Sequence, residues 1–491
     1  MKKNGVAKNY IYNLIYQFLT IFLPLITTPY LSRILGAKQI GIYGYTTSIV
    51  AYFILFGSLG ISMYGQREIA YFQDNKGKKS KIFWELVIIR FITLTISTLL
   101  FYFIFVRGKS YSLYYRILLV QLVANMFDIS WFFQGIEEFD KTVVRNLIVK
   151  LLCLVLIFTI VKDYDDLWKY FLIYACAEFI GNISIWLYMP KYINRISFSK
   201  LNFKKHIKPT LMLFLPQIAI QIYTVLDKTM IGILTNNMSE VGYYEQAQKI
   251  VRAAILVISA LQIVMNSRIA NAYSKKNKKE VHDCLEKSFR FVFILAIPMM
   301  FGLIGIANKF VPWYYGKGFD GVTGILIVIS PILIAIGLNG ITGIQYLVQI
   351  GKQNIFTKSV VIGSLINVAC NLLLIPKYGG IGAAIASVVA ESCIFLYQMK
   401  YFKNEFNLFQ ILKLSINNIV SGMVMLGVVI VLTNYLNISI INTMIEVLVG
   451  GIVYIMVLSI LKDKFFKDLV NQIYVGLKNK LGWCWCNFLK I

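Results

Sequence analysis

Three ionisable residues share one face of an apolar stretch in the middle of the chain. Glu245, Lys249 and Arg252 are separated by four and three residues, which places them on the same side of a helix. Glu245 and Lys249 can pair at i,i+4, which lowers the cost of burying both charges. Arg252 has no obvious partner on its own helix, and its guanidinium fork matches phosphate oxygens. The pattern predicts a site for an anionic group in an apolar environment.

Two other apolar stretches each carry a polar stripe. In residues 9–31, polar residues that include Gln17 recur at steps of three and four. In residues 209–234, Gln221 and Lys228 lie on a stripe with the same spacing. A polar face inside lipid is unfavourable unless it meets water or protein. The stripes therefore predict either a wet cavity that they both line or hydrogen bonds between packed helices.

Three of the carboxylates within apolar stretches are candidates for ion coupling. Glu178 and Glu391 each follow an alanine, 213 residues apart, and are interpreted either as packing partners or as sites for a coupling cation. Asp227 precedes Lys228 but points about 100° away from it on a helix, so the two need not neutralise each other. Asp227 is a third candidate for ion coupling.

The composition predicts a membrane protein. Of the 491 residues, 58% are hydrophobic and the mean hydropathy is +0.68. A membrane span needs roughly 20 apolar residues, and about 14 such stretches can be drawn. They are 9–31, 41–64, 82–106, 111–133, 144–162, 167–189, 209–234, 241–266, 287–308, 321–348, 357–376, 380–401, 411–434 and 440–461.

The net charge of +26 would suit nucleic acid, but the placement of the basic residues argues against that interpretation. With the amino terminus inside, 34 Lys and Arg fall in inside segments and 10 in outside loops. This bias follows the positive-inside rule and predicts that both termini are cytoplasmic. Basic residues on that side also favour an anionic inner leaflet.

Catalytic and metal-binding patterns were sought and not found. The seven cysteines are scattered, and only two histidines, His206 and His282, are present, both expected in loops. No zinc or haem spacing, nucleotide-binding loop or Ser/His/Asp arrangement can be proposed. We therefore expect neither a metal nor a cofactor, and no enzymatic activity.

An internal repeat is visible at an offset of 201 residues. Ile40-Gly41-Ile42-Tyr43 corresponds to Val241-Gly242-Tyr243-Tyr244, and the same offset carries Arg67 onto Arg268. Six spans return the chain to its starting side, so the repeats would be parallel. Arg67 and Arg268 are interpreted either as guards of an inner opening or as interfacial positive-inside residues.

The expected fold is all-α, with about 14 transmembrane helices. Two six-helix lobes would be related by a pseudo-two-fold axis along the membrane normal, followed by a helix pair. The expected divisions are an N-lobe at 1–208, a C-lobe at 209–408, the pair at 409–461 and a basic amphipathic cytoplasmic tail at 462–491.

Short sequences along nearly the whole chain resemble the bacterial oligosaccharide-lipid flippases. They are NYIYN at 9–13, PYLSRILG at 29–36, GIY at 41–43, DISWFFQG at 128–135, VGYYEQA at 241–247 and GGIGAA at 379–384. The wider superfamily also contains multidrug exporters and the peptidoglycan precursor flippase.

The resemblance implies 12 core helices around a central cleft and a flippase that works by alternating access. Its substrate would be a polyprenyl-(pyro)phosphate-linked oligosaccharide or teichoic-acid precursor, moved from the cytoplasmic to the outer leaflet of a bacterial cytoplasmic membrane for assembly of capsule or cell-wall polysaccharide. The expected headgroup-binding residues are Arg33, Lys228, Lys249, Arg252 and Arg268, with Arg67, Gln17, Gln221 and Glu245 beside them.

Two other functions are considered. An ion-coupled drug or metabolite exporter of the same fold would favour acidic groups, whereas these spans carry basic ones. A membrane glycan polymerase would need a long outer loop, and the outer loops are short. The expected partners are the lipid-linked glycan, membrane lipids and a polymerase or ligase of the same pathway, with the protein itself a monomer. The glycan is not specified by the sequence.

Overall fold

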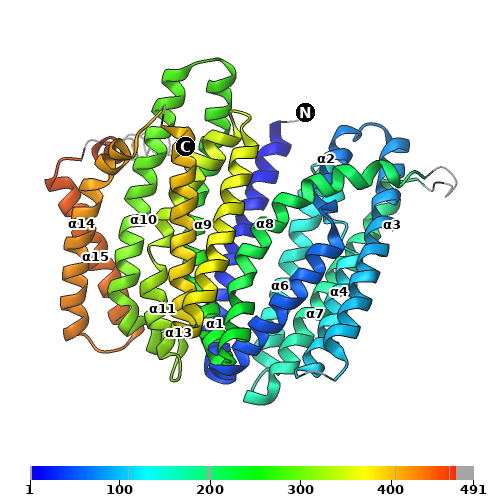
Figure 1. Cartoon of the computed structure of the whole chain (residues 1–491), viewed down its shortest axis with the longest axis horizontal. Helices are drawn as coiled ribbons and strands as arrows, with labels where there is room; N and C mark the ends of the chain where they lie inside the picture. Colours follow the sequence, from blue (N-terminus) through cyan, green and yellow to red (C-terminus); the bar gives the residue numbers. More distant parts are fainter. Residues whose placement is uncertain are drawn as a thin grey trace, which may run out of the picture. The chain divides into compact units, whose positions relative to one another are not determined.

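The computed structural model describes residues 3–108, 110–194, 196, 201–403, 405–463 and 465–471. Side chains are described from residue 23 onward, except at 139, 215–217, 219–220, 222–224, 260–261, 263–264 and 267. The regular secondary structure of this part of the chain is helical throughout (Figure 1). Most of the predicted tail at 462–491 lies outside the described residues.

Packing divides the chain into two compact units, which are described separately. The first comprises Met1–Ile250, Tyr315–Val322 and Ser364–Ala386, and the second comprises Val251–Tyr314, Thr323–Gly363 and Ser387–Ile491. These are boundaries of packing. The lobe boundaries at 208 and 408, which come from the repeat, stay a prediction.

The first unit is built from the amino-terminal helices. They are α1 (Lys3–Ser58), α2 (Ile61–Tyr71), α3 (Lys76–Phe101), α4 (Ser112–Met126), α5 (Ser130–Gly135), α6 (Phe139–Ile160), α7 (Leu167–Ser184), α8 (Lys204–Thr235) and the beginning of α9 (Met238–Ser274). Helices α4 and α7 pack side by side, and α6 packs on α7 (Figure 1). Helix α1 is broken at Gly36, whose φ of 69° is a left-handed conformation that glycine adopts without strain.

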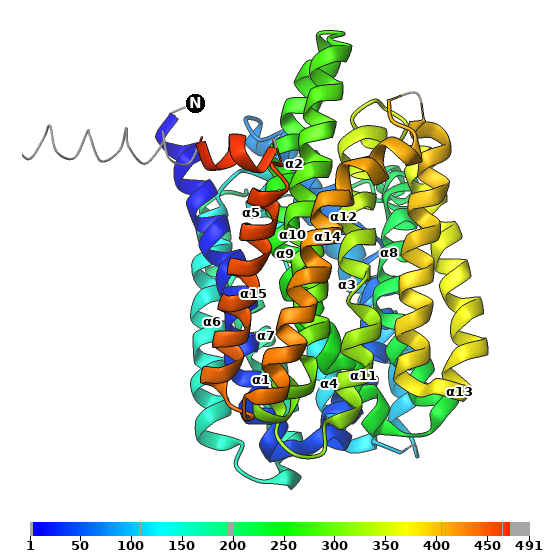
Figure 2. The same ribbon diagram turned by 90° about the vertical axis from the view of Figure 1, so that its left-hand side faces the viewer.

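The second unit contains the remaining helices. They are the rest of α9, α10 (Lys278–Tyr315), most of α11 (Asp320–Ile329), α12 (Ile332–Asn339) with the π-helix Gly340–Val348, the two ends of α13 (Gln353–Phe402), α14 (Leu408–Tyr435) and α15 (Ile440–Ile460). Helices α14 and α15 lie side by side as a hairpin (Figure 2). Asn407 and Gln410 form a capping box that fixes the start of α14.

The protein is an all-α, multi-pass membrane protein, as predicted. Nine helical segments of the described chain are long and apolar enough to cross a membrane, and the bent pair α11–α12 makes a tenth. Each of the 14 predicted spans consists mostly of helical residues, and α1 and α13 each carry residues of two of them. The predicted count of 14 is consistent with these helices.

Two glycines at the predicted repeat offset meet where α1 packs on α9. A Cβ added to Gly41 would overlap the carbonyl oxygen of Met238, and one added to Gly242 would overlap the carbonyl oxygen of Ala37. Since Ala37 and Gly41 correspond to Met238 and Gly242 at the offset of 201, the contacts are reciprocal. Reciprocal contacts are what a local two-fold relation between the segments produces. Only glycine permits this approach of the backbones.

The start of α8 is held against α2 and α3 by a polar clasp. His206 is 2% exposed; its Nε2 lies 2.8 Å from Glu85 Oε2, and its Nδ1 lies 2.9 Å from the Tyr64 hydroxyl. Lys205 Nζ lies 2.8 Å from the same Glu85 oxygen. Burial lowers the pKa of His206, which favours the neutral imidazole. Both histidines lie in helices, so their placement in loops was wrong.

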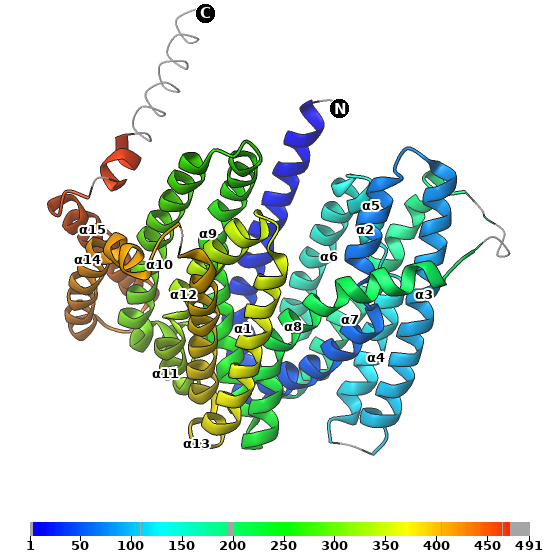
Figure 3. The same cartoon turned by 45° about the horizontal axis from the view of Figure 1, so that its top comes forward.

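The core beneath this clasp is aromatic. Helices α2 and α5 lie side by side (Figure 3). Trp131 of α5 is 1% exposed, and its ring packs against Gly65 of α2 and Phe83 of α3. A Cβ at Gly65 would lie 2.5 Å from the Trp131 ring, so the glycine provides room for the indole. This core holds α5 in place after the break between α4 and α5, and that break borders a cavity in the first unit.

Candidate functional site

The first unit contains a cavity of about 650 Å³ between helices α1, α4, α5, α6 and α7. Its wall combines apolar and aromatic side chains with many polar ones, although these helices are apolar enough to cross a membrane. The polar and charged lining residues are Thr27, Tyr43, Thr47, Gln121, Asn125, Asp128, Ser130, Gln134, Arg145, Asn146, Lys150, Tyr174, Glu178 and Asn182. A polar lining of this extent can replace the water around a hydrophilic ligand.

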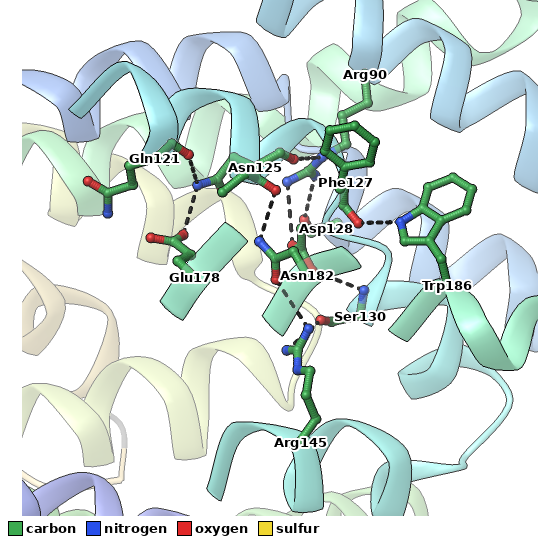
Figure 4. A network of polar contacts seen from close by, with 12 residues as sticks. Arg90, Gln121, Asn125, Phe127, Asp128, Ser130, Arg145, Glu178, Asn182 and Trp186 are labelled. Atoms are coloured by element: carbon green, nitrogen blue, oxygen red, sulfur yellow. Dashed lines mark hydrogen bonds and ion pairs between the residues drawn. The ribbon is translucent and has the colours of Figure 1, made fainter. Parts of the chain in front are cut away.

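A buried arginine organises one side of this cavity (Figure 4). Arg90 of α3 is 2% exposed, and its Nη2 lies 3.4 Å from Asp128 Oδ2. Its Nε donates to the backbone oxygen of Asn125 at 2.8 Å. Asp128 Oδ1 in turn accepts the backbone N–H of Ser130 at 3.0 Å. The pair therefore holds the interruption between α4 and α5 in place, inside the predicted span 111–133.

A second arginine joins α6 to α5 and α7. Arg145 donates through Nη1 to Asn182 Oδ1 at 3.1 Å and to the Gly181 oxygen at 3.2 Å, and through Nη2 to Ser130 Oγ at 3.3 Å. Asn182 donates to the backbone oxygen of Ala124 at 2.9 Å (Figure 4). Such a network fixes the positions of the polar groups that line the cavity.

Glu178 presents a carboxylate to the same cavity. Its Oε1 accepts from Asn125 Nδ2 at 2.9 Å, and Asn125 also donates to the backbone oxygen of Gln121 at 3.1 Å (Figure 4). A half-buried carboxylate in a polar cavity can accept hydrogen bonds from hydroxyl groups or bind a cation. The geometry is compatible with both chemistries, and the role of Glu178 in ion coupling stays a prediction.

Aromatic rings also form part of the cavity wall. The ring of Tyr43 packs against Tyr170 and Phe171, with centroids 4.7 and 5.0 Å apart, and against Tyr174 at 6.3 Å. Tyr43, Phe171 and Tyr174 line the cavity. Aromatic faces beside amide and carboxylate groups suit a ligand that has both apolar faces and hydroxyl groups, as sugars do.

Two of the predicted basic residues, Lys228 of α8 and Lys249 of α9, belong to the first unit but do not line this cavity. Lys228 Nζ lies 2.8 Å from Glu245 Oε2, and the two side chains are 12% and 13% exposed. The sequence predicted that Glu245 can pair with Lys249 on its own helix, and the structure shows an ion pair between Glu245 and Lys228 of α8. Lys249 is half-buried on α9, and Gln221 is half-buried on α8.

Asp227 belongs to a neighbouring buried network. It is 2% exposed and accepts hydrogen bonds from the hydroxyl of Tyr244 and from Asn371 Nδ2, the latter at 2.7 Å. These bonds connect α8 to α9 and to the part of α13 that belongs to the first unit. Both of these donors are neutral, and the role of Asp227 in ion coupling stays a prediction.

The remaining predicted residues are more exposed or lie in the second unit. Arg33, Arg67, Arg252 and Arg268 are exposed, and Arg67 lies 3.2 Å from Glu68. Glu391 is 7% exposed and accepts hydrogen bonds from Asn339 of α12. Gln17 lies in α1, outside the residues whose side chains are described.

Apart from Glu178, sequence reasoning did not identify the polar residues of the cavity wall as site residues. Arg145 was counted among the inside basic residues that set topology. Its neighbours carried a usable signal: Gln121 and Asn125, and again Glu178 and Asn182, are spaced by four in two apolar spans. These pairs predict a polar face on each helix, as the stripes of the first and seventh spans do.

Two family models match most of the chain. One, described as "Polysaccharide biosynthesis protein", matches residues 6–265, and the other, described as "Lipid II flippase MurJ", matches residues 147–450. A curated relative from Escherichia coli (strain K12), named "Putative O-antigen transporter", is 24% identical over 407 residues, which are 82% of this chain and 98% of the relative.

Solved structures show the same fold. A lipid II flippase MurJ in an inward closed conformation aligns with a TM-score of 0.74 at 20% identity, over 94% of this chain and all of that one. An inward-facing multidrug resistance transporter of the MATE family aligns with a TM-score of 0.62 at 14% identity, over 80% of this chain and 98% of that one. At these identities the likeness concerns the fold alone.

Proposed function

The chain belongs to the polysaccharide biosynthesis protein family, and we propose that it is a flippase for a lipid-linked oligosaccharide. It moves a polyprenyl-(pyro)phosphate-linked oligosaccharide or teichoic-acid precursor from the inner to the outer leaflet of a bacterial cytoplasmic membrane. The observation that carries the proposal is the polar cavity of about 650 Å³ among membrane-crossing helices of a member of this family.

The physical problem for such a substrate is its headgroup. A phosphate and several sugars cannot enter hydrocarbon without losing their hydration, whereas the apolar polyprenyl chain is soluble in hydrocarbon. A cavity lined by amides, carboxylates and cations replaces water around the headgroup. The lipid chain then stays in the bilayer while alternating access exposes the headgroup first to one side and then to the other.

Basic side chains supply the anion recognition in this proposal. Lys249 and Arg252 of α9 and the Lys228–Glu245 pair lie on consecutive helices, and Arg33, Arg67 and Arg268 are exposed where they can meet an approaching phosphate. Glu178, Asp227 and Glu391 are the candidates for coupling to an ion gradient. In this proposal both termini lie in the cytoplasm, as the distribution of basic residues favours, and the protein acts as a monomer.

The test is transport by the purified protein in liposomes that contain a lipid-linked oligosaccharide. A glycosidase added outside reports how much of the glycan reaches the outer leaflet. The wild-type protein should expose glycan at least ten times faster than empty liposomes, and Arg252→Glu should lose at least ten-fold of that rate. Exposure at the rate of empty liposomes would sink the proposal.

A matched control separates recognition of the headgroup from general charge effects. Lys278→Glu makes the same reversal at an exposed residue at the start of α10, and it should transport at the wild-type rate. Arg252→Lys keeps the charge and should retain part of the activity. Full activity of Arg252→Glu would show that Arg252 does not bind the phosphate of the headgroup.

A further inference from the structure

The second unit contains a cavity of about 460 Å³, which shares no lining residue with the cavity of the first unit. It lies where the start of α10, the start of α14 and the end of α15 come together. Its lining residues are His282, Glu286, Arg290, Phe406, Gln410, Lys413, Leu414, Asn417, Lys462 and Asp463. The sequence assigned several of these basic residues only a topogenic role.

Three elements each turn one polar face into this cavity. On α10, His282, Glu286 and Arg290 are spaced by four residues and so share a face. On α14, the lining residues between 410 and 417 recur at helical spacing. After α15, the chain turns at Lys462, whose φ of 54° is left-handed. The cavity is therefore assembled from residues far apart in the sequence.

The carboxylates of this cavity are already engaged. Glu286 Oε1 lies 2.8 Å from Arg290 Nε. Asp463 is 6% exposed and accepts from Asn417 Nδ2 at 3.0 Å and from the Phe466 backbone N–H at 3.0 Å. These hydrogen bonds satisfy the aspartate with neutral donors, and they hold the turn after α15 against α14.

The cations of the cavity exceed its carboxylates. Among the described residues, Lys413 and Lys462 have no carboxylate within ion-pair distance. The ring of His282 stacks on Phe406, with centroids 4.2 Å apart and planes 12° apart, and no described group hydrogen-bonds to its nitrogens. The cavity thus carries excess positive charge and free donors, which suits an anion with several oxygens.

Exposed apolar side chains border the cavity along both helices of the hairpin. Phe409 and Leu412 of α14 are 75% and 53% exposed, and Ile460 of α15 is 75% exposed. In a membrane-spanning hairpin such side chains meet lipid chains. A ligand that fits both surfaces has a charged phosphate end and an apolar end, which a free phosphate or a nucleotide does not.

We propose that this cavity binds the phosphate headgroup of an anionic membrane lipid, with its chains along α14 and α15. Lys413, Lys462 and His282 contact the phosphate oxygens, while Phe409, Leu412 and Ile460 contact the chains. The inference does not depend on the proposed flippase activity, because a bound phospholipid would stabilise the hairpin in any membrane protein. A polyprenyl phosphate has the same chemistry and is a second source of the same ligand.

The test measures binding of a labelled phosphatidylglycerol to the detergent-purified full-length protein. Lys413→Gln combined with Lys462→Gln should weaken binding at least ten-fold. Lys275→Gln combined with Lys276→Gln removes the same charge from exposed lysines outside the cavity and should leave affinity unchanged. Equal losses in both variants, or no loss in either, would overturn the site. Because all four lysines are exposed, both variants should keep the wild-type melting temperature.

Competitors identify the source of the phosphate. Unlabelled phosphatidylglycerol and polyprenyl phosphate should displace the label, whereas diacylglycerol, which has chains without phosphate, should not. Inorganic phosphate and glycerol 3-phosphate should compete at least a hundred-fold more weakly, and equal competition by them would overturn the assignment to a lipid. Preferential displacement by polyprenyl phosphate would support the site and show that its lipid belongs to the same class as the proposed transport substrate.

A second variant tests the contacts with the lipid chains. Phe409→Glu should weaken lipid binding while leaving the lysines in place, and unchanged affinity would show that Phe409 does not contact the chains.

Discussion

The two repeat-related segments around Gly41 and Gly242 share their backbone packing but differ in charge. At the offset of 201, Lys228 and Glu245 of the second copy correspond to Thr27 and Gly44 of the first. The second copy has an ion pair with an N–O distance of 2.8 Å. In the first copy, the Thr27 hydroxyl donates to the backbone oxygen of Leu23 at 3.1 Å. The ion pair therefore exists in one copy only.

A neighbouring pair of positions repeats this contrast. Asp227 and Tyr244 are hydrogen-bonded in the second copy and correspond to Ile26 and Tyr43 in the first. Ile26 is 54% exposed, and the Tyr43 ring packs on Phe171. A mutual contact across a local two-fold requires small residues in both copies, but side chains away from it can differ. Polar chemistry was therefore free to develop in one copy without disturbing the packing.

Removing one charge of the ion pair should have the largest effect. Lys228→Met removes the cation that lies 2.8 Å from the mostly buried Glu245 carboxylate, and breaking a buried pair in this way costs about 3–5 kcal/mol. We expect this loss in the free energy of unfolding, measured by denaturation in mixed micelles. The corresponding change in the first copy, Thr27→Val, removes only a hydrogen bond to the same helix and should cost about 1 kcal/mol.

The double variant Lys228→Met with Glu245→Met is the control for this prediction. It removes both charges, so it should recover much of the stability that the single variant loses. Equal losses in the single and double variants would show that the packing of the methylene groups, rather than the ion pair, stabilises the contact between α8 and α9.

Most of the fold follows from the sequence because its causes are local. The spans are set by runs of apolar residues, and every predicted span consists mostly of helical residues. The repeat predicted that Gly41 and Gly242 are equivalent, and the structure shows why both are glycine. The sequence did not predict the interruption between α4 and α5, because it depends on Arg90 reaching Asp128 from another helix.

The site was less predictable because its contacts join distant segments. The spacing of Glu245 and Lys249 correctly placed them on one face, but the rotation of α8 against α9 decides that Lys228 meets Glu245. In the sequence, Arg145 looks like any basic residue at the inner end of a span. Its hydrogen bonds to residues of α5 and α7 show that it is a structural part of the cavity wall. The roles of the predicted binding residues stay predictions.

The reciprocal glycines should respond equally. Gly41→Ala and Gly242→Ala each place a methyl group on a backbone carbonyl of the other segment, so the helices must separate. We expect each to lower the free energy of unfolding by about 1–3 kcal/mol, with the two losses within about 0.5 kcal/mol of each other. Gly451→Ala in α15, where a Cβ meets nothing within 4 Å, is the control and should not destabilise. A loss at one glycine only would contradict the local two-fold relation.

Removing the hydroxyl group should destabilise the protein moderately more at Tyr244 than at the equivalent Tyr43. Tyr244→Phe removes a hydrogen bond to the carboxylate of Asp227, and hydrogen bonds to charged groups contribute about 1.5–3 kcal/mol. Tyr43→Phe keeps the ring that packs on Tyr170 and Phe171, so its loss should be smaller. Thermal unfolding of the two purified variants under one condition checks the order. The reverse order would place the more important hydroxyl in the first copy.

The smallest effect is expected at Gly44, the equivalent of Glu245. A Cβ at Gly44 would lie 3.5 Å from Val241 Cγ1 and 3.8 Å from Glu245 Cβ, which is ordinary van der Waals contact. The helix therefore has room for a methyl group, and Gly44→Ala should stabilise the protein by about 0.5–1 kcal/mol through the lower entropy of the unfolded chain. A destabilisation of the size expected at Gly41 would mean that Gly44 is required by backbone packing. Stabilisation would show instead that a side chain is tolerated here in both copies, so that the charge asymmetry between them reflects chemistry and not available space.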